Sequence, residues 1–227
     1  AAGFGANDLV SQVLDFAREG PSTRKQLELN ATLQNSRSMV ESFGKKKIHI
    51  EWELYPESLL VEADPVQLGQ VLMNLAINAV DACEEGALVQ IRTRRLLLGR
   101  RYTDRSVTLD PGHYAVIDVR DTGSGIPDEV KEKLFDPFFT TKEVGDGTGL
   151  GLSVSYGIIA QLGGKLWAES DGKSKATFHI EVPRMAVQQA SALLEDVTDQ
   201  TDEDDRLEGE PDSSISVLVV DDGPDLR

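Results

Sequence analysis

A run of glycines directly before an apolar helical segment constrains this chain more than any other feature. Gly145, Gly147, Gly149 and Gly151 alternate with other residues, and the segment LSVSYGIIAQL follows at once. Glycine lets successive backbone amides converge, and the positive end of a helix that begins here would face the same point. The pattern predicts an anion-binding nest, for which a polyphosphate is the natural ligand. Its spacing fits neither a P-loop nor a Rossmann site.

Polar and aromatic residues precede these glycines. Thr140 and Thr141 stand beside Lys142, whose ammonium group is expected to contact the outermost phosphate. We expect residues 128–147 to form a mobile lid over the nest. Three aromatic side chains would hold the closed lid, namely Phe135, Phe138 and Phe139. A flexible glycine-rich linker is the alternative, but a linker does not need three phenylalanines.

Composition limits the class of protein. The 227 residues carry a formal net charge of -16, with 40% hydrophobic and 27% charged residues. This size allows one good core, so we expect one main domain. The acidic charge argues against nucleic acid as a partner, because phosphate backbones select basic surfaces. No apolar run approaches the roughly 20 residues of a membrane helix, and the single cysteine, Cys83, fits a reducing compartment. We expect a cytoplasmic location, with a parent protein that could be anchored to the inner membrane.

Periodic apolar patterns indicate strands and helices in no regular alternation. The expected strands cover 48–55, 87–98, 112–121, 165–170 and 176–183. The expected helices cover 7–19, 27–47, 65–83 and 152–164. Asp64 and Pro65 stand in the favoured order of cap and first helical turn. The mixture predicts the α+β class, with a mixed sheet covered on one face by helices.

The helix expected over 65–83 carries two amides on one face. Asn74 and Asn78 are four residues apart and lie beside an apolar stripe that includes Leu72 and Leu75. Asparagine disfavours helix interiors, so such a pair indicates a ligand or a hydrogen-bonding partner. For this helix alone, bonds from both amides to neighbouring backbone would be the simpler reading.

A carboxylate ends the strand expected over 112–121. Alternation places Asp121 on the same face as Ile117 and Val119, so it should be sheltered. A buried carboxylate needs a donor, and the exocyclic amine of adenine is a suitable one. Gly123 and Gly125 then leave the backbone bare for a flat base. Taken alone, the segment would be better interpreted as an ordinary Asp-Thr-Gly turn.

In this order, the helix amides, DTGSGIP, LFDPFFTTK and GTGLGLS resemble the N box, first glycine box, F box and second glycine box of sensor histidine kinases. The motifs span residues 64–154, within a looser similarity over 27–183. The resemblance implies the Bergerat or GHKL fold, an α/β sandwich that uses ATP with magnesium. It also implies transfer of the γ-phosphoryl group to a histidine.

The resemblance implies roles for individual positions. Asn78 takes the magnesium-ligand position and Asp121 the adenine-binding position. The base-stacking turn would be Gly123 and Gly125, and the phosphate cradle Gly147, Gly149, Leu150 and Gly151. The other expected nucleotide contacts are Asp81, Ile126, Phe135, Thr140, Thr141, Lys142, Thr148 and Leu152.

Asn74 separates two activities within the superfamily. Gyrases, mismatch-repair ATPases and heat-shock chaperones resemble one another in having a water-activating glutamate at this position. An amide cannot act as a general base at neutral pH, so we expect slow hydrolysis and transfer to an external acceptor. The residues expected to carry catalysis are Asn74, Asn78 and Lys142. The alternative is a nucleotide-binding regulatory module without phosphotransfer.

The resemblance and the composition together predict four segments. They are 1–22, the truncated tail of a dimerisation and phosphoacceptor domain; 23–185, the catalytic domain; 186–214, an acidic linker; and 215–227, the truncated start of a receiver domain. None of the chain's histidines, His49, His113 and His179, matches the acceptor motif. The expected partners are therefore a dimerisation domain bearing that histidine and a response-regulator receiver. The parent, a hybrid kinase, is expected to be a homodimer, whereas this chain could be monomeric.

The sequence leaves two further features undecided, the role of one group of arginines and the register of the last two strands. The arginines of residues 92–105 are expected on solvated strand faces, with docking of an acidic partner as the alternative. The turn GKSKATF departs from the family because it lacks a second glycine before its small residues. The register of the last two strands is therefore uncertain.

Overall fold

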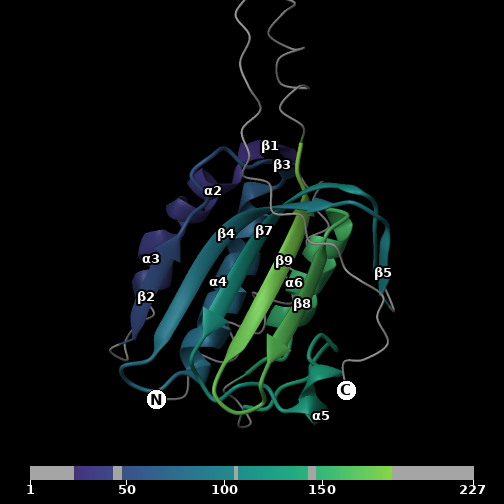
Figure 1. Ribbon diagram of the computed structural model, residues 1–227. Helices are drawn as coiled ribbons and strands as arrows, with labels where there is room; N and C mark the ends of the chain where they lie inside the picture. Colours follow the sequence, from purple (N-terminus) through teal and green to yellow (C-terminus); the bar gives the residue numbers. More distant parts are fainter. Residues whose placement is uncertain (1–22, 43–47, 105–106, 143–146, 186–227) are drawn as a thin grey trace, which may run out of the picture.

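A five-stranded mixed sheet forms the centre of the molecule, in the order β2-β4-β7-β9-β8 (Figure 1). This computed structural model describes residues 23–42, 48–104, 107–142 and 147–185. β2 pairs parallel to β4, and the other neighbours are antiparallel. The strands are β2 (His49–Glu53), β4 (Leu88–Leu98), β7 (Gly112–Asp121), β8 (Lys165–Ser170) and β9 (Ala176–Pro183). These bounds match the five predicted strands within a few residues, and the predicted α+β class is confirmed.

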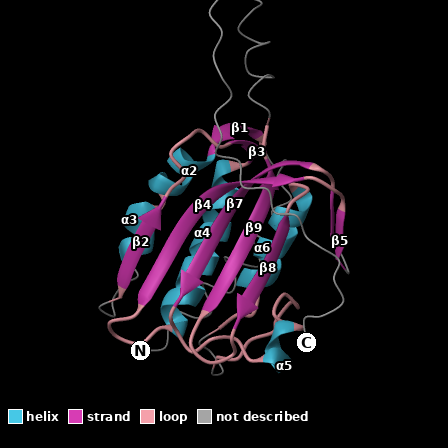
Figure 2. Ribbon diagram, in the orientation of Figure 1, coloured by secondary structure: helices cyan, strands magenta, loops and turns pink. Residues whose placement is uncertain are grey.

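Helices cover one face of this sheet (Figure 2). They are α2 (Leu29–Asn35), α3 (Arg37–Ser42), α4 (Pro65–Ala82) and α6 (Gly151–Gln161), and a short α5 (Asp128–Lys131) lies at the edge. α4 begins as predicted, because the Asp64 carboxylate accepts from the backbone amide of Val66 at 2.9 Å and Pro65 follows in the first turn.

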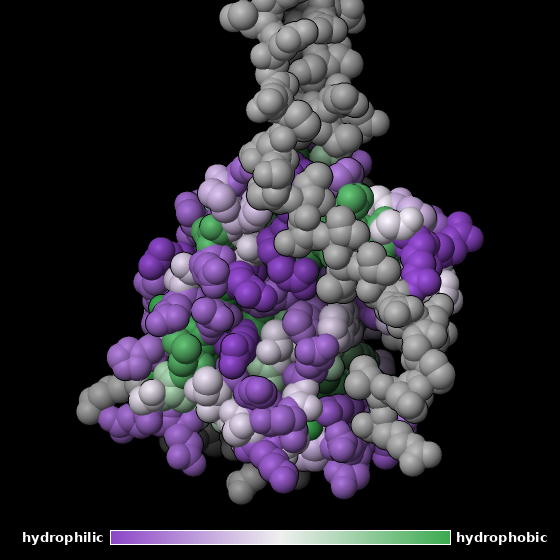
Figure 3. Space-filling model, viewed as in Figure 1, coloured by the Kyte–Doolittle hydropathy of each residue, from purple (hydrophilic) through white to green (hydrophobic). Residues whose placement is uncertain are grey.

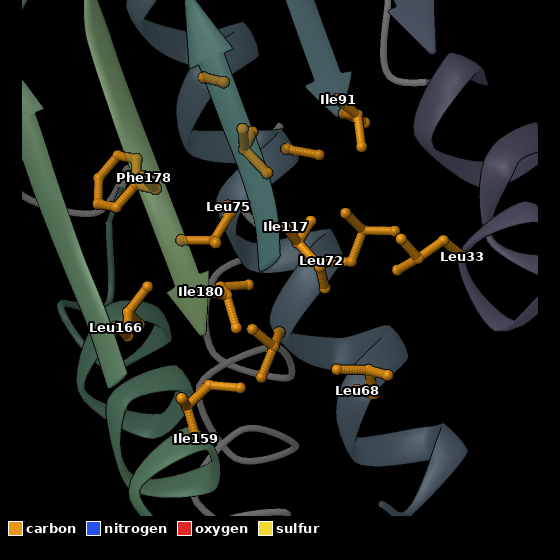
Figure 4. Packing of buried hydrophobic residues seen from close by; sticks show 14 of the residues in the cluster. Leu33, Leu68, Leu72, Leu75, Ile91, Ile117, Ile159, Leu166, Phe178 and Ile180 are labelled. Carbon is orange, nitrogen blue, oxygen red and sulfur yellow. The ribbon is translucent and has the colours of Figure 1, made fainter. Parts of the chain in front are cut away.

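The core fills the space between the sheet and the two long helices (Figure 4). Leu72 and Leu75 of α4 lie toward Ile117 of β7 and Ile180 of β9, and none of the four is measurably exposed. Burial of each such side chain contributes about 1.5–3 kcal/mol to folding. α4 and α6 are therefore anchored along their length, and their polar positions have fixed places.

The opposite face of the sheet is polar over much of its area (Figure 3). Beyond the upper ends of β4 and β7 the chain forms the hairpin of β5 (Tyr102–Asp104) and β6 (Val107–Leu109), with β5 at the right of the molecule in Figure 1. This hairpin contributes to a second apolar cluster made of Leu96, Leu98, Leu109, Tyr114 and Val116. Lower on the same face, the carboxylate of Asp118 is 3% exposed and is bound by Arg92, Arg94 and His179. Arg92 and Arg94 thus lie on a strand face, as expected, but they bind a buried acid. Arg100 and Arg101 lie between β4 and β5 and not on a strand, and Arg105 is outside the described residues.

The helix predicted over 27–47 is wrong in its first part. Residues Lys25–Glu28 form β1, which pairs antiparallel with β3 (Leu60–Ala63) and places Leu27 opposite Val61. The chain then forms two short helices separated at Ser36. Local periodicity indicated one helix, but a strand partner more than thirty residues away decides the conformation.

Several predicted segments lie outside the described residues. They are the helix over 7–19, the end of the second helix near Gly44, the acidic linker and the strand after residue 214. Within the described ranges, no helix combines the length and the apolar character needed to cross a membrane.

Candidate functional site

One pocket of about 740 Å³ opens where α4, the end of β7 and the start of α6 meet. It brings together most of the predicted site residues, namely Asn74, Asn78, Asp81, Asp121, Gly125, Ile126, Thr140, Thr141, Lys142, Gly147, Thr148, Gly149, Gly151 and Leu152. Three predicted residues, Gly123, Phe135 and Leu150, lie beside the pocket rather than in its lining. The four motifs therefore converge in space.

The amides of α4 lie at the side of this pocket next to α6. The Nδ2 group of Asn74 donates to the carbonyl oxygen of Gly151 at 3.1 Å and to the hydroxyl of Ser155 at 3.2 Å. Asn78, one turn later, has no side-chain hydrogen bond among the described residues. The two amides thus differ: one ties α4 to the first turn of α6, and the other faces the pocket with its oxygen available.

Asp121 is the most deeply buried acid of the pocket, at 1% exposure. Its carboxylate accepts from the backbone N–H of Gly123 at 2.9 Å and from that of Ala176. Burial raises the pKa of Asp121, although the two N–H donors partly offset that effect. A sheltered carboxylate with remaining acceptor capacity suits a ligand that brings N–H donors.

The turn after Asp121 is held close to its surroundings. Gly125 has φ +73°, and a Cβ there would lie 2.7 Å from the backbone nitrogen of Lys173. The backbone N–H of Ser124 donates to the carbonyl of Ala82 at the end of α4. A larger residue at position 125 would therefore push the turn off the sheet.

The second glycine segment leads into α6. Gly149 has φ +66°, and a Cβ there would lie 2.4 Å from the carbonyl carbon of Phe138. The backbone N–H of Phe138 donates to the Gly149 carbonyl at 3.0 Å. This close backbone contact joins the lid segment to the start of α6, whose first residue is Gly151. The first residues of α6, Gly151 and Leu152, thus line the pocket, where the positive end of the helix favours an anion.

The lid segment is only partly as expected. Phe135 packs against the core, with its ring centroid 5.3 Å from that of Tyr156, and Phe139 lines the pocket. Phe138, in contrast, is 73% exposed. Lys142 reaches across the pocket mouth, and its Nζ lies 2.6 Å from a carboxylate oxygen of Asp81.

Apolar residues of the pocket were missed by sequence reasoning. They are Ile77, Ala82, Val130, Leu134, Ala176 and Phe178. Ile77 was detectable as the neighbour of Asn78 on α4. Ala176 and Phe178 come from β9, and only the pairing of Asp121 with Ala176 reveals their place.

The three histidines lie away from this pocket. His49 and His113 are exposed on β2 and β7, and neither lines the pocket. The Nδ1 of His179 lies 2.7 Å from Asp118, and its ring stacks on Trp167 at 4.1 Å. His179 is thus a cross-strand residue, paired with Asp118 of β7 and Trp167 of β8.

Comparisons with known proteins agree with this geometry. Residues 63–186 match the family described as histidine kinase-, DNA gyrase B-, and HSP90-like ATPase. The chain is 41% identical over 180 residues to the sensor kinase CckA of Brucella abortus (strain 2308), covering 79% of this chain and 19% of that protein. It is 34% identical over 181 residues to the sensor protein FixL of Bradyrhizobium diazoefficiens, covering 78% of this chain and 33% of that protein. The chain thus spans a third or less of the length of these curated relatives.

Solved structures give the same result. The catalytic domain of the histidine kinase ThkA has a TM-score of 0.56 and 33% identity, covering 71% of this chain and 95% of that domain. Full-length ShkA in complex with AMPPNP has a TM-score of 0.61 and 26% identity, covering 79% of this chain and 36% of that one. The chain therefore belongs to the histidine kinase-, DNA gyrase B-, and HSP90-like ATPase family and contains the ATP-binding catalytic domain of sensor histidine kinases.

Proposed function

We propose that this chain binds ATP with magnesium in the pocket beside α4 and transfers the γ-phosphoryl group to a histidine on a separate dimerisation domain. The observation that carries the proposal is the convergence of Asn78, Asp121 and residues 147–151 on one pocket of about 740 Å³. That volume lies within the range typical of small-molecule sites. The similarity to the sensor kinase CckA supports the same reaction.

Adenine is proposed to bind at the Asp121 end of the pocket. The carboxylate would accept from the exocyclic amine, which supplies the donor that this buried acid needs. Gly123 and Gly125 would let the turn lie close to the end of α4 and to the β8–β9 turn, and Ile126 and Leu152 of the pocket lining would be apolar contacts of the base. Phe135 would support this lining from behind through its contact with Tyr156.

The phosphates are proposed to bind at the start of α6. The backbone from Gly147 to Gly151, with Thr148 and Leu150, would supply amide donors, and the helix N-terminus favours negative charge. Lys142, Thr140 and Thr141 would contact the outermost phosphate. Lys142 would leave Asp81 to reach that phosphate, and Asp81 would then face the phosphate through water.

Asn78 is proposed as the protein's ligand to magnesium. A neutral amide oxygen suits this hard cation, which keeps several waters and takes the rest of its ligands from phosphates. Within the described ranges no group of three or more His, Cys, Asp or Glu side chains could form a metal cage. One protein ligand beside a triphosphate fits that donor set, and bound magnesium would neutralise charge on the transferring phosphoryl group.

Asn74 favours transfer over hydrolysis. Its Nδ2 is directed at Gly151 and Ser155, and an amide cannot take a proton from water at neutral pH. The site is therefore proposed to keep the phosphoryl group until an acceptor histidine approaches. Asn74 would act in catalysis by holding the phosphate-binding helix against α4.

The wider assembly is also part of the proposal. Residues 23–185 would be the catalytic domain, flanked by 1–22 from a dimerisation domain, the acidic linker 186–214 and a receiver beginning at 215. The parent would be a cytoplasmic or inner-membrane homodimer that passes its phosphoryl group to a receiver. A solved complex of ThkA with its response regulator TrrA supports the last step.

Incubation with γ-labelled ATP, magnesium and a purified dimerisation domain tests the proposal. Label is expected on the acceptor histidine, and none with an acceptor in which that histidine is replaced by alanine. The Asn78→Ala variant should bind ATP without magnesium normally but transfer little label. Binding of ATP without any transfer would leave a nucleotide-sensing regulatory module as the function.

A further inference from the structure

Ser170, the last residue of β8, makes a set of contacts that the nucleotide site does not yet explain. Its hydroxyl oxygen accepts from the backbone N–H of Ile126 at 2.7 Å and from that of Gly172 at 3.1 Å, and it donates to the carbonyl of Lys175 at 2.6 Å. A hydroxyl has one donor and two acceptor positions, so its capacity is fully used. The backbone carbonyl of Ser170 accepts from Nζ of Lys131 at 2.8 Å. Ser170 therefore joins three separate segments at one point.

The register of the sheet places Ser170 in line with Asp121. Asp121 on β7 is paired with Ala176 on β9, and Ala176 is paired with Ser170 on β8. Residues paired across neighbouring strands point to the same face, so all three side chains face the pocket side of the sheet. The backbone N–H of Ala176 also donates to the Asp121 carboxylate. The paired ends of β7, β9 and β8 therefore fix the positions of both the Asp121 carboxylate and the Ser170 hydroxyl.

Gly125 shows how tightly the two turns meet. A Cβ at this position would lie 2.7 Å from the Lys173 nitrogen and 3.1 Å from Oγ of Ser170. Its neighbour Ile126, whose amide the hydroxyl binds, lines the nucleotide pocket. Any movement of the β8–β9 turn would therefore move the wall of that pocket.

Hydrogen bonds to the Asp171 side chain hold the β8–β9 turn in its conformation. The Asp171 carboxylate accepts from the backbone N–H groups of Lys173 and Ser174 at 2.9 Å each, and from the hydroxyl of Ser174 at 2.7 Å. Behind the turn, a hollow of about 640 Å³ on the open face is lined by Lys131, Ser170, Asp171 and Lys175. The turn thus has this hollow on one side and the backbone at Gly125 on the other. The Ser170 hydroxyl joins the turn to the pocket wall through its hydrogen bond with the Ile126 amide.

We propose that Ser170 is a positioning residue for adenine recognition: its hydroxyl fixes the Gly125–Ile126 turn at the distance from Asp121 that a flat base requires. This inference rests on the proposed binding of ATP in the pocket. Ser170 does not touch the nucleotide in this arrangement. Without the hydroxyl, the Ile126 amide would lose its acceptor and the turn could settle nearer to or farther from the sheet.

Equilibrium binding of ATP, ADP and GTP to the whole chain tests the proposal. Because a part-buried hydrogen bond is lost, Ser170→Ala is expected to weaken the binding of ATP and of ADP by about fivefold to tenfold. The ratio of ATP to ADP affinity should stay unchanged, because the γ-phosphate lies at the far end of the site. The preference for ATP over GTP should fall, because discrimination depends on the position of the base. Ser170→Thr, which keeps the hydroxyl, should restore binding.

Ser174→Ala is the matched control. It removes a hydroxyl from the same turn, one that donates to Asp171 and is exposed, and its affinities should stay within about twofold of wild type, as for surface substitutions. Wild-type affinity in Ser170→Ala, or an equal loss in Ser174→Ala, would overturn the proposal while leaving ATP binding intact. A wild-type chain that binds no ATP would instead defeat the proposed function.

Amide hydrogen exchange on the wild-type chain gives a test that does not depend on a folded variant. The Ile126 amide should exchange slowly, because it is bonded to Oγ of Ser170, and addition of ADP should slow it further. In Ser170→Ala this amide should lose its protection, while amides in the middle of β9 keep theirs. Fast exchange at Ile126 in the wild-type protein would show that the hydroxyl does not hold the turn.

Discussion

The ammonium group of Lys142 lies 2.6 Å from the carboxylate of Asp81 across the mouth of the pocket. Lys142 belongs to the lid segment and Asp81 to the last turn of α4, three residues after Asn78. The two side chains are 34% and 47% exposed, so water screens the pair and its contribution to stability is small. In the proposed reaction Lys142 has to leave Asp81 for the outermost phosphate. The ion pair therefore competes with the nucleotide.

Removal of the competing acid should strengthen ATP binding. An exposed pair is worth about 0.2–1 kcal/mol, so Asp81→Asn is expected to lower the ATP dissociation constant by up to about fivefold. AMP, which lacks the outer phosphates, should bind as it does to wild type. Titration calorimetry with both nucleotides measures the two effects, and the gain should shrink in high salt.

The double variant separates the role of Lys142 from that of Asp81. Lys142→Gln should weaken ATP binding, and adding Asp81→Asn to it should then bring little further change. If Asp81→Asn alone weakens ATP binding, Asp81 itself contacts the nucleotide, and the Lys142–Asp81 pair does not compete with it.

Asp121→Asn should separate nucleotide binding from stability. Burial raises the pKa of Asp121 in the folded chain, so its ionised form is less favourable in the fold than in the unfolded chain. The acid therefore costs stability as the pH rises through its folded pKa, and the amide should leave the melting temperature at pH 7 unchanged or higher. The bond to adenine would be lost, which predicts ATP binding weaker by about tenfold or more.

Thermal melts at pH 3 and pH 7 and a nucleotide titration check both halves. The stability gain of Asp121→Asn over wild type should be larger at pH 7 than at pH 3, below the unfolded value of 3.8, which is the sign expected for a raised pKa. Unaltered nucleotide affinity in a folded variant would place adenine elsewhere in the pocket.

The fold was predictable where a pattern is local. Strand alternation around Ile117 and the Asp64–Pro65 cap gave the central sheet and α4 within a few residues. β1 was missed because Leu27 owes its strand conformation to pairing with Val61, which no local periodicity records. The register of β8 and β9 stayed open for the same reason, since the turn between them departs from the family pattern.

The polar and glycine residues of the candidate site could be predicted from the sequence, but the contacts between their side chains and distant segments could not. Asn78, Asp121 and the glycines stand in motifs, so their order along the chain was informative. The pair of Lys142 with Asp81 and the bond from Ser170 to Ile126 each join segments more than forty residues apart. The sequence also could not show that Asn74 and Asn78 differ, because that depends on the place of α6.

Asn74→Asp should weaken the packing of α6 on α4. A carboxylate cannot donate to the Gly151 carbonyl at neutral pH, and it would lie beside that oxygen. We expect a loss of about 1–3 kcal/mol in the free energy of unfolding. Urea denaturation measures this loss, and ATP binding should weaken with it because the proposed phosphate-binding segment ends at Gly151, where α6 begins.

Asn78→Asp serves as the control for the destabilisation expected of Asn74→Asp. Its side chain makes no hydrogen bond within the described ranges, so the unfolding free energy should change less than in Asn74→Asp. Magnesium-dependent phosphotransfer should nevertheless be disturbed. Equal destabilisation by both substitutions would contradict the distinct roles assigned to the two amides.

The buried Asp118 should make stability depend on acid pH. Its bonds to His179, Arg94 and Arg92 hold the pKa of this carboxyl well below its usual range, despite burial. A lowered pKa gives stability that is present above the unfolded value of 3.8 and is lost as the pH falls toward the folded value.

Asp118→Asn is therefore expected to lose about 1–3 kcal/mol of unfolding free energy at pH 7, and the difference from wild type should shrink below about pH 4. Asp110→Asn is the control, because Asp110 pairs with Arg101 at 67% exposure and should cost less than about 1 kcal/mol. A difference between Asp118→Asn and wild type that persists unchanged to pH 2 would mean that shape, and not charge, makes Asp118 important.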